Sequence, residues 1–295
     1  MLTFQTAIPP IDSRLAFSPD SRYLAIAGRG PNVEILDLTA GTILPVPKAD
    51  PYTLDRVWFT PGGRLFVSLW DRMFDFGRTF ESKIKRTDLV LDLGSPRGFS
   101  PDFRYAILTS GQGPRLKMHF VEFGRRLQTH WTIPTPNAFN NHAAIPPDAS
   151  RILTVTIDGT ILDRSPVSGA ILSKSKNKIM IRQFEFTADG ERLVARTRTG
   201  SPYVWDGGDL KKKPRRVNVK HKRNITDMAL HPNGRAALLA TKDGPIAVAD
   251  LGRTASEHGY DWKIGPTESV AVSPDGQLAA ALGERGQLVV WDLDF

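Results

Sequence analysis

The 295-residue sequence predicts an all-β protein assembled from copies of one small unit, and two observations lead to that expectation. The first is a turn motif of the Ser-Pro-Asp-Gly type, which recurs along the whole chain at a nearly constant spacing. The second is the order of features around each turn, where short apolar strands alternate with turn-forming residues. Four short strands in roughly 40–45 residues is the pattern of one blade of a β-propeller.

Seven turns of this kind occur, as in "AFSPDSRYLAIA" near the start and "AVSPDGQLAAAL" near the end. Their anchors are 42, 40, 46, 41, 44 and 42 residues apart and are Pro19, Pro61, Pro101, Pro147, Ala188, Pro232 and Pro274. The third strand of each unit ends in an acid, in order Asp37, Asp75, Glu122, Asp163, Asp206, Asp250 and Asp292. No run has convincing helical periodicity. The sequence therefore predicts a seven-bladed β-propeller with four-stranded antiparallel blades, in one domain spanning residues 1–295.

The two ends of the chain complete this pattern. The last unit supplies three strands and stops at "LVVWDLDF", residues 288–295, whereas a surplus strand, "LTFQTAI" at residues 2–8, precedes the first unit. An unpaired outer edge is usually protected, so we expect residues 2–8 to pair with residues 288–295 and close the last blade. Deletion of residues 2–8 should therefore lower the stability of the fold.

The repeats resemble those of WD-repeat propellers over essentially the whole chain. Besides the turns, the matching strand ends are "VWD" at 204–206, "VWD" at 290–292, "ILD" at 35–37 and "VAD" at 248–250. The Gly-His of that family is missing almost everywhere. Only His221 fits it, with Lys220 in place of the glycine, and Asp243 stands where the family keeps a loop aspartate. The resemblance implies a rigid platform that holds peptides or proteins together.

The composition excludes several kinds of functional site. The chain has no cysteine, which excludes disulfides, thiolate metal sites and cysteine catalysis, and 40% of its residues are hydrophobic. No apolar run approaches the roughly 18 residues of a membrane span, and the start lacks the pattern of a secretory signal. We therefore expect a monomer in the cytoplasm, without a membrane span.

The formal charge of +8 is concentrated in one segment, "LKKKPRRVNVKHKR" at residues 210–223. In the repeat pattern it forms the outer strand of blade five, expected at "VNV", and the flanking loops. One interpretation is a rim that binds an anionic partner, and the other is an outer strand protected by lysines against edge-to-edge aggregation. The predicted binding residues are Lys211, Lys212, Lys213, Arg215, Arg216, Lys220, Lys222 and Arg223.

A long connection, residues 132–147, joins the third and fourth units and is expected to be a polar loop, where Phe139 and His142 are candidate contacts for a protein partner. Trp58 replaces the alanine or glycine of most other units, and we expect it to fill a gap between blades. An arginine follows six of the seven turns, at Arg22, Arg64, Arg104, Arg151, Arg192 and Arg235. These arginines could form a positive annulus on one face, although ordinary polar positions screened by turn acids are the simpler interpretation.

No catalytic motif is found. The six histidines make no HExxH or other close metal-ligand pair, and no Gly-x-Ser-x-Gly elbow occurs. We therefore predict a non-catalytic scaffold for protein–protein interaction, without cofactor or metal, whose partner is acidic. One alternative is a propeller enzyme resembling a lactonase-type hydrolase, which requires His, Glu or Arg side chains to converge in the central channel. The other is nucleic-acid binding through the basic segment, without sequence specificity.

Overall fold

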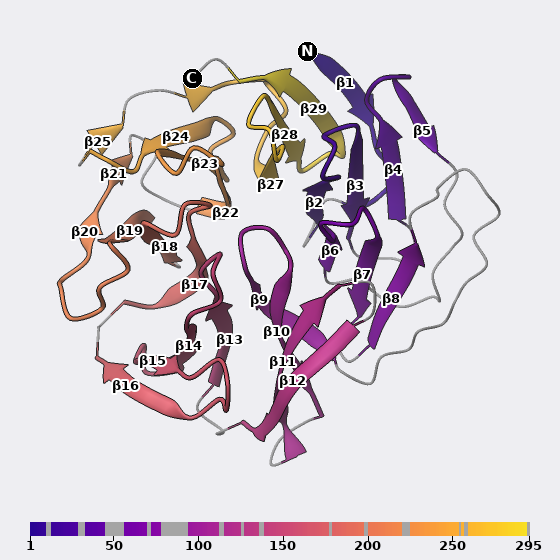
Figure 1. Cartoon of the computed structure of the whole chain (residues 1–295). Coiled ribbons are helices and arrows are strands. Elements are labelled where there is room, and N and C mark those ends of the chain that lie inside the picture. Colours follow the sequence, from indigo (N-terminus) through magenta and orange to yellow (C-terminus); the bar gives the residue numbers. More distant parts are fainter. Residues whose placement is uncertain are drawn as a thin grey trace.

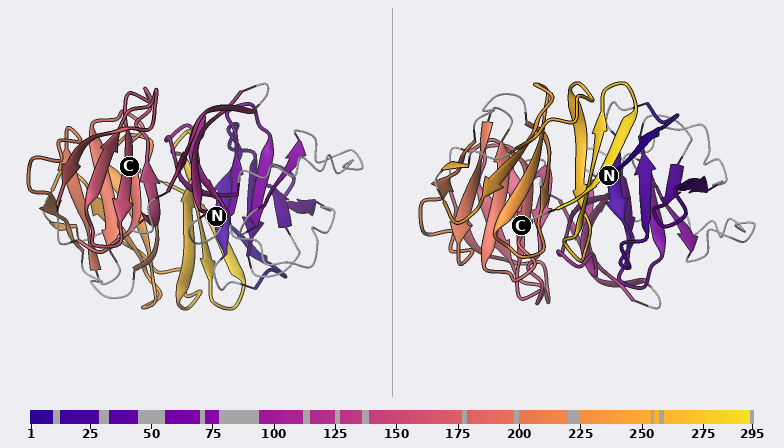
Figure 2. Two further views of the ribbon diagram at one scale, coloured as in Figure 1. Left: turned by 90° about the horizontal axis from the view of Figure 1, so that it is seen from below. Right: turned by 90° about the horizontal axis from the view of Figure 1, so that it is seen from above.

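A computed structural model describes residues 1–9, 13–28, 33–44, 56–69, 72–77, 94–111, 115–124, 127–135, 139–176, 179–197, 200–219, 225–253, 255–256 and 259–293. Every regular element in these residues is a β-strand. The strands form six four-stranded sheets and one three-stranded sheet, all antiparallel, and one small parallel pair. Figure 1 shows the sheets set around a common central space, and Figure 2 shows their strands running along the axis of that space.

The antiparallel sheets follow one another along the chain and are called units one to seven. Unit one is β2 (Arg14–Phe17), β3 (Tyr23–Ala27), β4 (Val33–Asp37) and β5 (Thr42–Leu44). Unit two is β6 (Arg56–Phe59), β7 (Leu65–Leu69) and β8 (Arg72–Gly77). Unit three is β9 (Ser95–Phe99), β10 (Tyr105–Ser110), β11 (Lys117–Phe123) and β12 (Leu127–Pro134). Unit four is β13 (Phe139–Ala144), β14 (Ile152–Thr156), β15 (Ile161–Arg164) and β16 (Ile171–Ser175).

The remaining units have the same order of strands. Unit five is β17 (Ile181–Phe186), β18 (Arg192–Thr197), β19 (Gly200–Asp206) and β20 (Arg215–Arg216). Unit six is β22 (Ile225–Leu230), β23 (Ala236–Thr241), β24 (Ile246–Asp250) and β26 (Gly259–Tyr260). Unit seven is β27 (Thr267–Val272), β28 (Leu278–Gly283), β29 (Gln287–Asp292) and β1 (Leu2–Gln5). The parallel pair, β21 (Asn218–Val219) with β25 (Ala255–Ser256), joins the segment after β20 of unit five to the segment between β24 and β26 of unit six.

The recurring turn is held by its own side chains. In unit one, the Ser18 hydroxyl donates to Asp20, and the Asp20 carboxylate accepts the Arg22 backbone N–H at 3.1 Å. The Tyr23 N–H returns to the Ser18 hydroxyl at 2.8 Å. The same contacts recur in units three, five and seven. These bonds satisfy the turn backbone locally, which explains why the Pro-Asp pattern is visible in the sequence.

Apolar clusters fill the spaces between neighbouring sheets. Trp58 is 1% exposed and packs between units two and three, with its ring centroid 5.6 Å from that of Phe66 and 5.1 Å from that of Phe99. This confirms the expectation that Trp58 fills a gap between sheets. Units three and four meet closely at Gly98, where an added Cβ would lie 1.9 Å from the Ala143 carbonyl oxygen. Only glycine fits that approach.

The predicted pairing of the chain ends is present. β1 pairs antiparallel with β29, from Leu2 opposite Val290 to Gln5 opposite Gln287, and the two strands lie side by side in Figure 1. The segment after β1 then contacts unit one, because the Thr6 hydroxyl donates to the Glu34 carboxylate at 2.6 Å. The same carboxylate accepts the Ala7 N–H at 2.9 Å.

Candidate functional site

The basic segment of unit five lies at the outer edge of its sheet, as the sequence predicted, but its outer strand is displaced. The strand that pairs with β19 is β20, rather than "VNV" at 217–219. Val217 and Val219 are instead buried between units five and six, where they anchor the segment. This burial explains the difference, because the valines pack inward while the preceding arginines complete the sheet.

Four of the predicted binding residues have exposed side chains, namely Lys211, Lys212, Lys213 and Arg216. The loop that carries them is fixed at its start, since Asp209 accepts the Lys211 backbone N–H at 2.9 Å and lies 3.9 Å from the Lys212 ammonium. Three further predicted residues, Lys220, Lys222 and Arg223, lie outside the described residues, as does His221.

Arg215 differs from its neighbours because its guanidinium is already engaged within the chain. It donates to the Arg253 carbonyl at 2.8 Å and to the Leu251 carbonyl, and it lies 3.5 Å from Asp206. These contacts tie the outer strand of unit five to the loop after β24. Arg215 therefore holds the sheets together, and the surface available to a partner depends on the exposed lysines and Arg216.

Two lysines of unit four adjoin this segment. Lys174 and Lys176, on and just after β16, are exposed, and the Ser175 hydroxyl between them donates to the Leu210 carbonyl at 2.8 Å. That bond places the outer strand of unit four against the loop before Lys211. Six exposed cations at the outer edges of the two units are hereafter called the basic rim: Lys174, Lys176, Lys211, Lys212, Lys213 and Arg216.

The expected polar loop at residues 132–147 is largely strand, and the placement of Phe139 and His142 in a loop was wrong. β12 continues to Pro134 and β13 begins at Phe139. An irregularity in the pairing of β13 with β14 interrupts the alternation of apolar and polar residues, which hid the strand in the sequence. Only the backbone of Phe139 is described, whereas His142 lines the central space.

The central space is a channel of about 600 Å³, lined by the innermost strand of every unit. One part of its wall is apolar and consists of residues next to the seven turns, including Phe17, Phe59, Phe99 and Phe186. Another part carries charge. Five arginines line it, hereafter the channel arginines: Arg14, Arg56, Arg97, Arg182 and Arg196. His142, Glu185 and Asp227 lie on the same wall.

The electrostatics of these groups confirm their proximity. Burial, followed by the charges of Arg56, Arg182, Arg196 and Arg97, lowers the pKa of His142 to about 3. Burial also raises the pKa of Glu185, although a hydrogen bond from Gln183 at 2.8 Å acts in the opposite direction. His142 is therefore neutral at pH 7, in a positive potential that opposes its protonation.

The sequence reasoning missed the channel arginines, although a signal for them exists. Arg14, Arg56 and His142 each stand five residues before the proline of their turn, so they share one position of the repeat. Residues in that position, on the innermost strand, converge when the sheets surround an axis. The turns and the third-strand ends, from which the repeat was predicted, do not include this position.

The second arginine series has a different environment. Four of its members pair with the acid at the third-strand end of their own unit: Arg22 with Asp37 at 2.7 Å, Arg104 with Glu122 at 2.8 Å, Arg151 with Asp163 at 3.4 Å and Arg192 with Asp206 at 3.2 Å. Hydrogen bonding from Arg22 lowers the pKa of Asp37. The sequence identified both series but did not pair them, and this pairing favours a structural role over a positive annulus.

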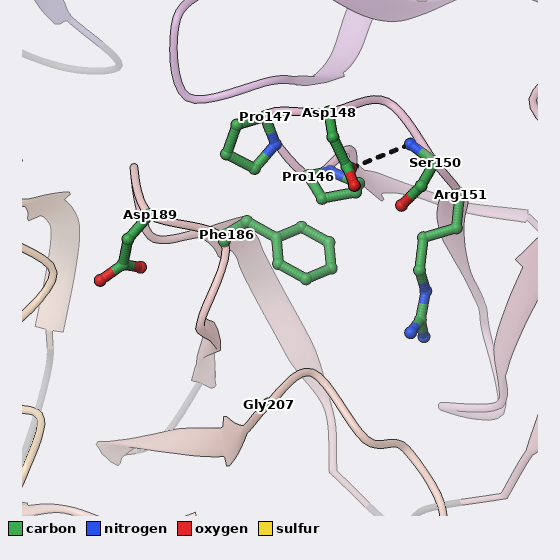
Figure 3. A pocket seen from close by; sticks show the side chains of 9 residues that line it. Pro146, Pro147, Asp148, Ser150, Arg151, Phe186, Asp189 and Gly207 are labelled. Atoms are coloured by element: carbon green, nitrogen blue, oxygen red, sulfur yellow. Dashed lines mark hydrogen bonds between the residues drawn. The ribbon is translucent and has the colours of Figure 1, made fainter.

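A smaller hollow lies on the turn face between units four and five, with a volume of about 270 Å³. Figure 3 shows Phe186 facing the Pro146–Pro147 turn, with Asp148 bonded to the Ser150 backbone. That bond is the largest cause of the lowered pKa of Asp148. The Asp148 carboxylate therefore stabilises its own turn, and few polar groups in the hollow remain to bind a ligand.

The described residues contain no cluster of three or more His, Asp or Glu side chains placed to hold a metal ion. They also contain no helix with the length and apolar character needed to cross a bilayer.

Comparison with known proteins adds sequence and fold relatives, although no family model matches the chain. The target of rapamycin complex subunit wat1 of Schizosaccharomyces pombe, a WD-repeat protein, is 28% identical over 107 residues. That alignment covers 36% of this chain and 33% of wat1, so the chain matches about a third of that relative's length. The structure of Kuenenia stuttgartiensis hydrazine synthase, a β-propeller, is similar with a TM-score of 0.72 and 15% identity, over 98% of this chain and 97% of that one. The predicted resemblance is thus confirmed: this chain is similar in sequence to a WD-repeat protein and has an all-β fold like that of a β-propeller.

Proposed function

We propose that this protein is a non-catalytic scaffold for protein–protein interaction, and that its basic rim binds an acidic segment of a protein partner. In this proposal the seven units are the seven blades of one closed ring, completed where β1 meets β29. The similarity to wat1, which is named as a subunit of a complex, supports a role in assembly. Cytoplasmic location and a monomeric state remain predictions.

The observation that carries the proposal is that six exposed cations from two units lie in one cluster. Lys174 and Lys176 are brought beside Lys211–Lys213 by the bond between Ser175 and Leu210. Edge protection needs charged side chains on the edge strand alone, whereas a cluster of six that spans two units produces a potential that attracts and orients an acidic partner. The contacts of Arg215 hold the supporting strand in place, so the cluster sits on a fixed surface.

Affinity capture from the native cell tests this proposal. The rim variant replaces Lys211, Lys212, Lys213 and Arg216 with Gln. A control variant removes the same charge elsewhere, by replacing the exposed residues Lys117, Arg235, Lys242 and Arg285 with Gln. We expect a set of proteins with acidic segments to be captured by the wild type and the control and lost with the rim variant, with binding that weakens as salt is raised.

Three other results would contradict the proposal. Loss of all captured material after nuclease treatment would favour the nucleic-acid alternative, for which affinity for a random oligonucleotide should fall steeply with salt. Equal capture by all three proteins would leave the basic rim as edge protection. Turnover of lactone substrates by the purified protein would show that the chain is an enzyme of the other predicted class.

A further inference from the structure

The channel has an uneven balance of charge that the basic rim does not explain. Its wall brings together five arginines and three carboxylates, Asp102, Glu185 and Asp227, which leaves an excess of two positive charges. Asp227 is held by unit seven, since its carboxylate accepts the Ser269 hydroxyl at 2.8 Å and the Val270 N–H at 3.3 Å. Because burial raises the pKa of Glu185, that carboxyl contributes less negative charge than an exposed one.

Three of the channel arginines donate hydrogen bonds to neutral acceptors. Arg14 donates to the Ser13 carbonyl at 2.9 Å, and Arg97 donates to the Thr109 hydroxyl at 2.7 Å. Arg196 donates to the Gln183 side-chain oxygen at 3.1 Å and to the Ile225 carbonyl at 2.8 Å. A carbonyl, hydroxyl or amide oxygen orients a guanidinium group and leaves its formal charge in place.

The shape of the channel suits a small ligand. A volume of about 600 Å³ lies within the range of ordinary small-molecule sites. The apolar wall formed by Phe17, Phe59, Phe99 and Phe186 lowers the local dielectric, so each charge interaction inside is stronger than on the surface. Arginine provides planar donor pairs that match phosphate and carboxylate oxygens, and here several such groups come from different strands.

We propose that the channel is a binding site for a small multivalent oxyanion, a compound with several phosphate or carboxylate groups, held by the channel arginines. Arg14 and Arg56 approach it from units one and two, Arg97 from unit three, and Arg182 and Arg196 from unit five. Since the site draws on several units, a bound anion would also link sheets that are not consecutive in the chain.

Calorimetric titration with two probes, tripolyphosphate and citrate, tests the proposal and separates phosphate from carboxylate recognition. The variants are Arg14→Gln and Arg182→Gln, and circular dichroism verifies their folding. A contact between a charged donor and an anion is worth enough that each variant should lose roughly tenfold in affinity. The matched control is Arg104→Gln, which removes an arginine paired with Glu122 outside the channel.

A second readout does not depend on the variants. The proximity of a bound anion should raise the pKa of His142 above its value of about 3, and NMR of the histidine ring follows this change. The groups that act on His142 are Arg56 on β6, Arg97 on β9, Arg182 on β17 and Arg196 on β18. A nonspecific electrostatic effect at the outer surface would leave His142 unchanged.

The results also separate this proposal from the scaffold function. The rim variant should bind both probes like the wild type, because its substitutions lie outside the channel. The proposal is overturned if neither probe binds, if Arg14→Gln and Arg182→Gln bind as tightly as the wild type, or if the rim variant loses binding. Binding of only an acidic peptide, with no effect of either probe, would also overturn it and would assign the channel to a protein partner.

Discussion

Replacing Trp58 tests whether aromatic packing holds units two and three together. The side chain is 1% exposed and lies against Phe66, Phe99 and Phe123, with ring centroids 5.6, 5.1 and 6.0 Å away. Truncation of a buried aromatic residue to Ala typically costs about 3–5 kcal/mol. The cavity is walled by residues fixed in strands, including Leu108, so it cannot collapse freely, and we expect about 4 kcal/mol for Trp58→Ala.

The indole N–H gives this prediction an internal comparison. Trp58 Nε1 is buried and has no hydrogen-bond partner among the described residues. Trp58→Phe keeps a ring in the stack and removes this unpaired donor, whose burial costs about 1–3 kcal/mol. The smaller ring loses roughly 2 kcal/mol of packing, so the two effects largely cancel. We expect a net loss of about 1 kcal/mol or less.

Urea unfolding followed by circular dichroism measures both variants against the wild type. The free energies are comparable if the slopes of the transitions agree, because the slope reports the surface exposed on unfolding. If Trp58→Ala cost less than about 1 kcal/mol, or if both variants were destabilised equally, the argument from aromatic packing would fail.

Three further predictions concern other parts of the fold. Gly98→Ala should prevent soluble folding or cost several fold more stability than Gly252→Ala, and urea unfolding of both variants measures this. The Cβ added at Gly252 meets only the Asp250 side chain of its own turn, at 3.3 Å. The pKa of Asp37 is lowered by Arg22, so their interaction stabilises the protein above the unfolded carboxyl pKa of about 3.9 and is lost as pH falls through the folded value. Arg22→Gln should therefore reduce the loss of stability between pH 7 and pH values of about 3, and an unchanged acid dependence would contradict the pairing. The pKa of His142 is about 3 in the folded chain and 6.5 ordinarily, so the unfolded chain takes up a proton first and stability falls as pH decreases through that window. His142→Asn should weaken this dependence in thermal unfolding, and an equal slope would show that His142 is not shielded.

Local chemistry explains how much of the fold could be predicted. The Ser18 and Asp20 side chains bond their own turn, so the motif is readable wherever it recurs. The edge left by β29 required a partner, and only the strand before unit one was available in the repeat pattern, so β1 could be assigned. Trp58 was recognised because its position in the repeat otherwise holds small residues.

The site was harder to predict because its contacts join distant segments. The sequence predicts Arg215 as a cation free to bind a partner, whereas its guanidinium donates to the carbonyls of Leu251 and Arg253 in the next unit. Nothing near Arg215 in the sequence indicates them. His142 follows two asparagines, so a strand with a pairing irregularity looked like a polar loop. The convergence of the channel arginines depends on the arrangement of whole sheets around an axis, which a strand-by-strand interpretation does not represent.

The seam between β1 and β29 also determines how the molecule responds to mechanical force. Leu2 lies opposite Val290, and the Met1 amino group is 3.8 Å from Asp292, so both strands leave the ladder at the same end. Tension applied through the two termini therefore loads the cross-strand hydrogen bonds one pair after another, because those bonds run perpendicular to antiparallel strands. The hydrogen bonds between β1 and β29 therefore break one after another. Pulling at the two ends opens unit seven while the other sheets bear no load.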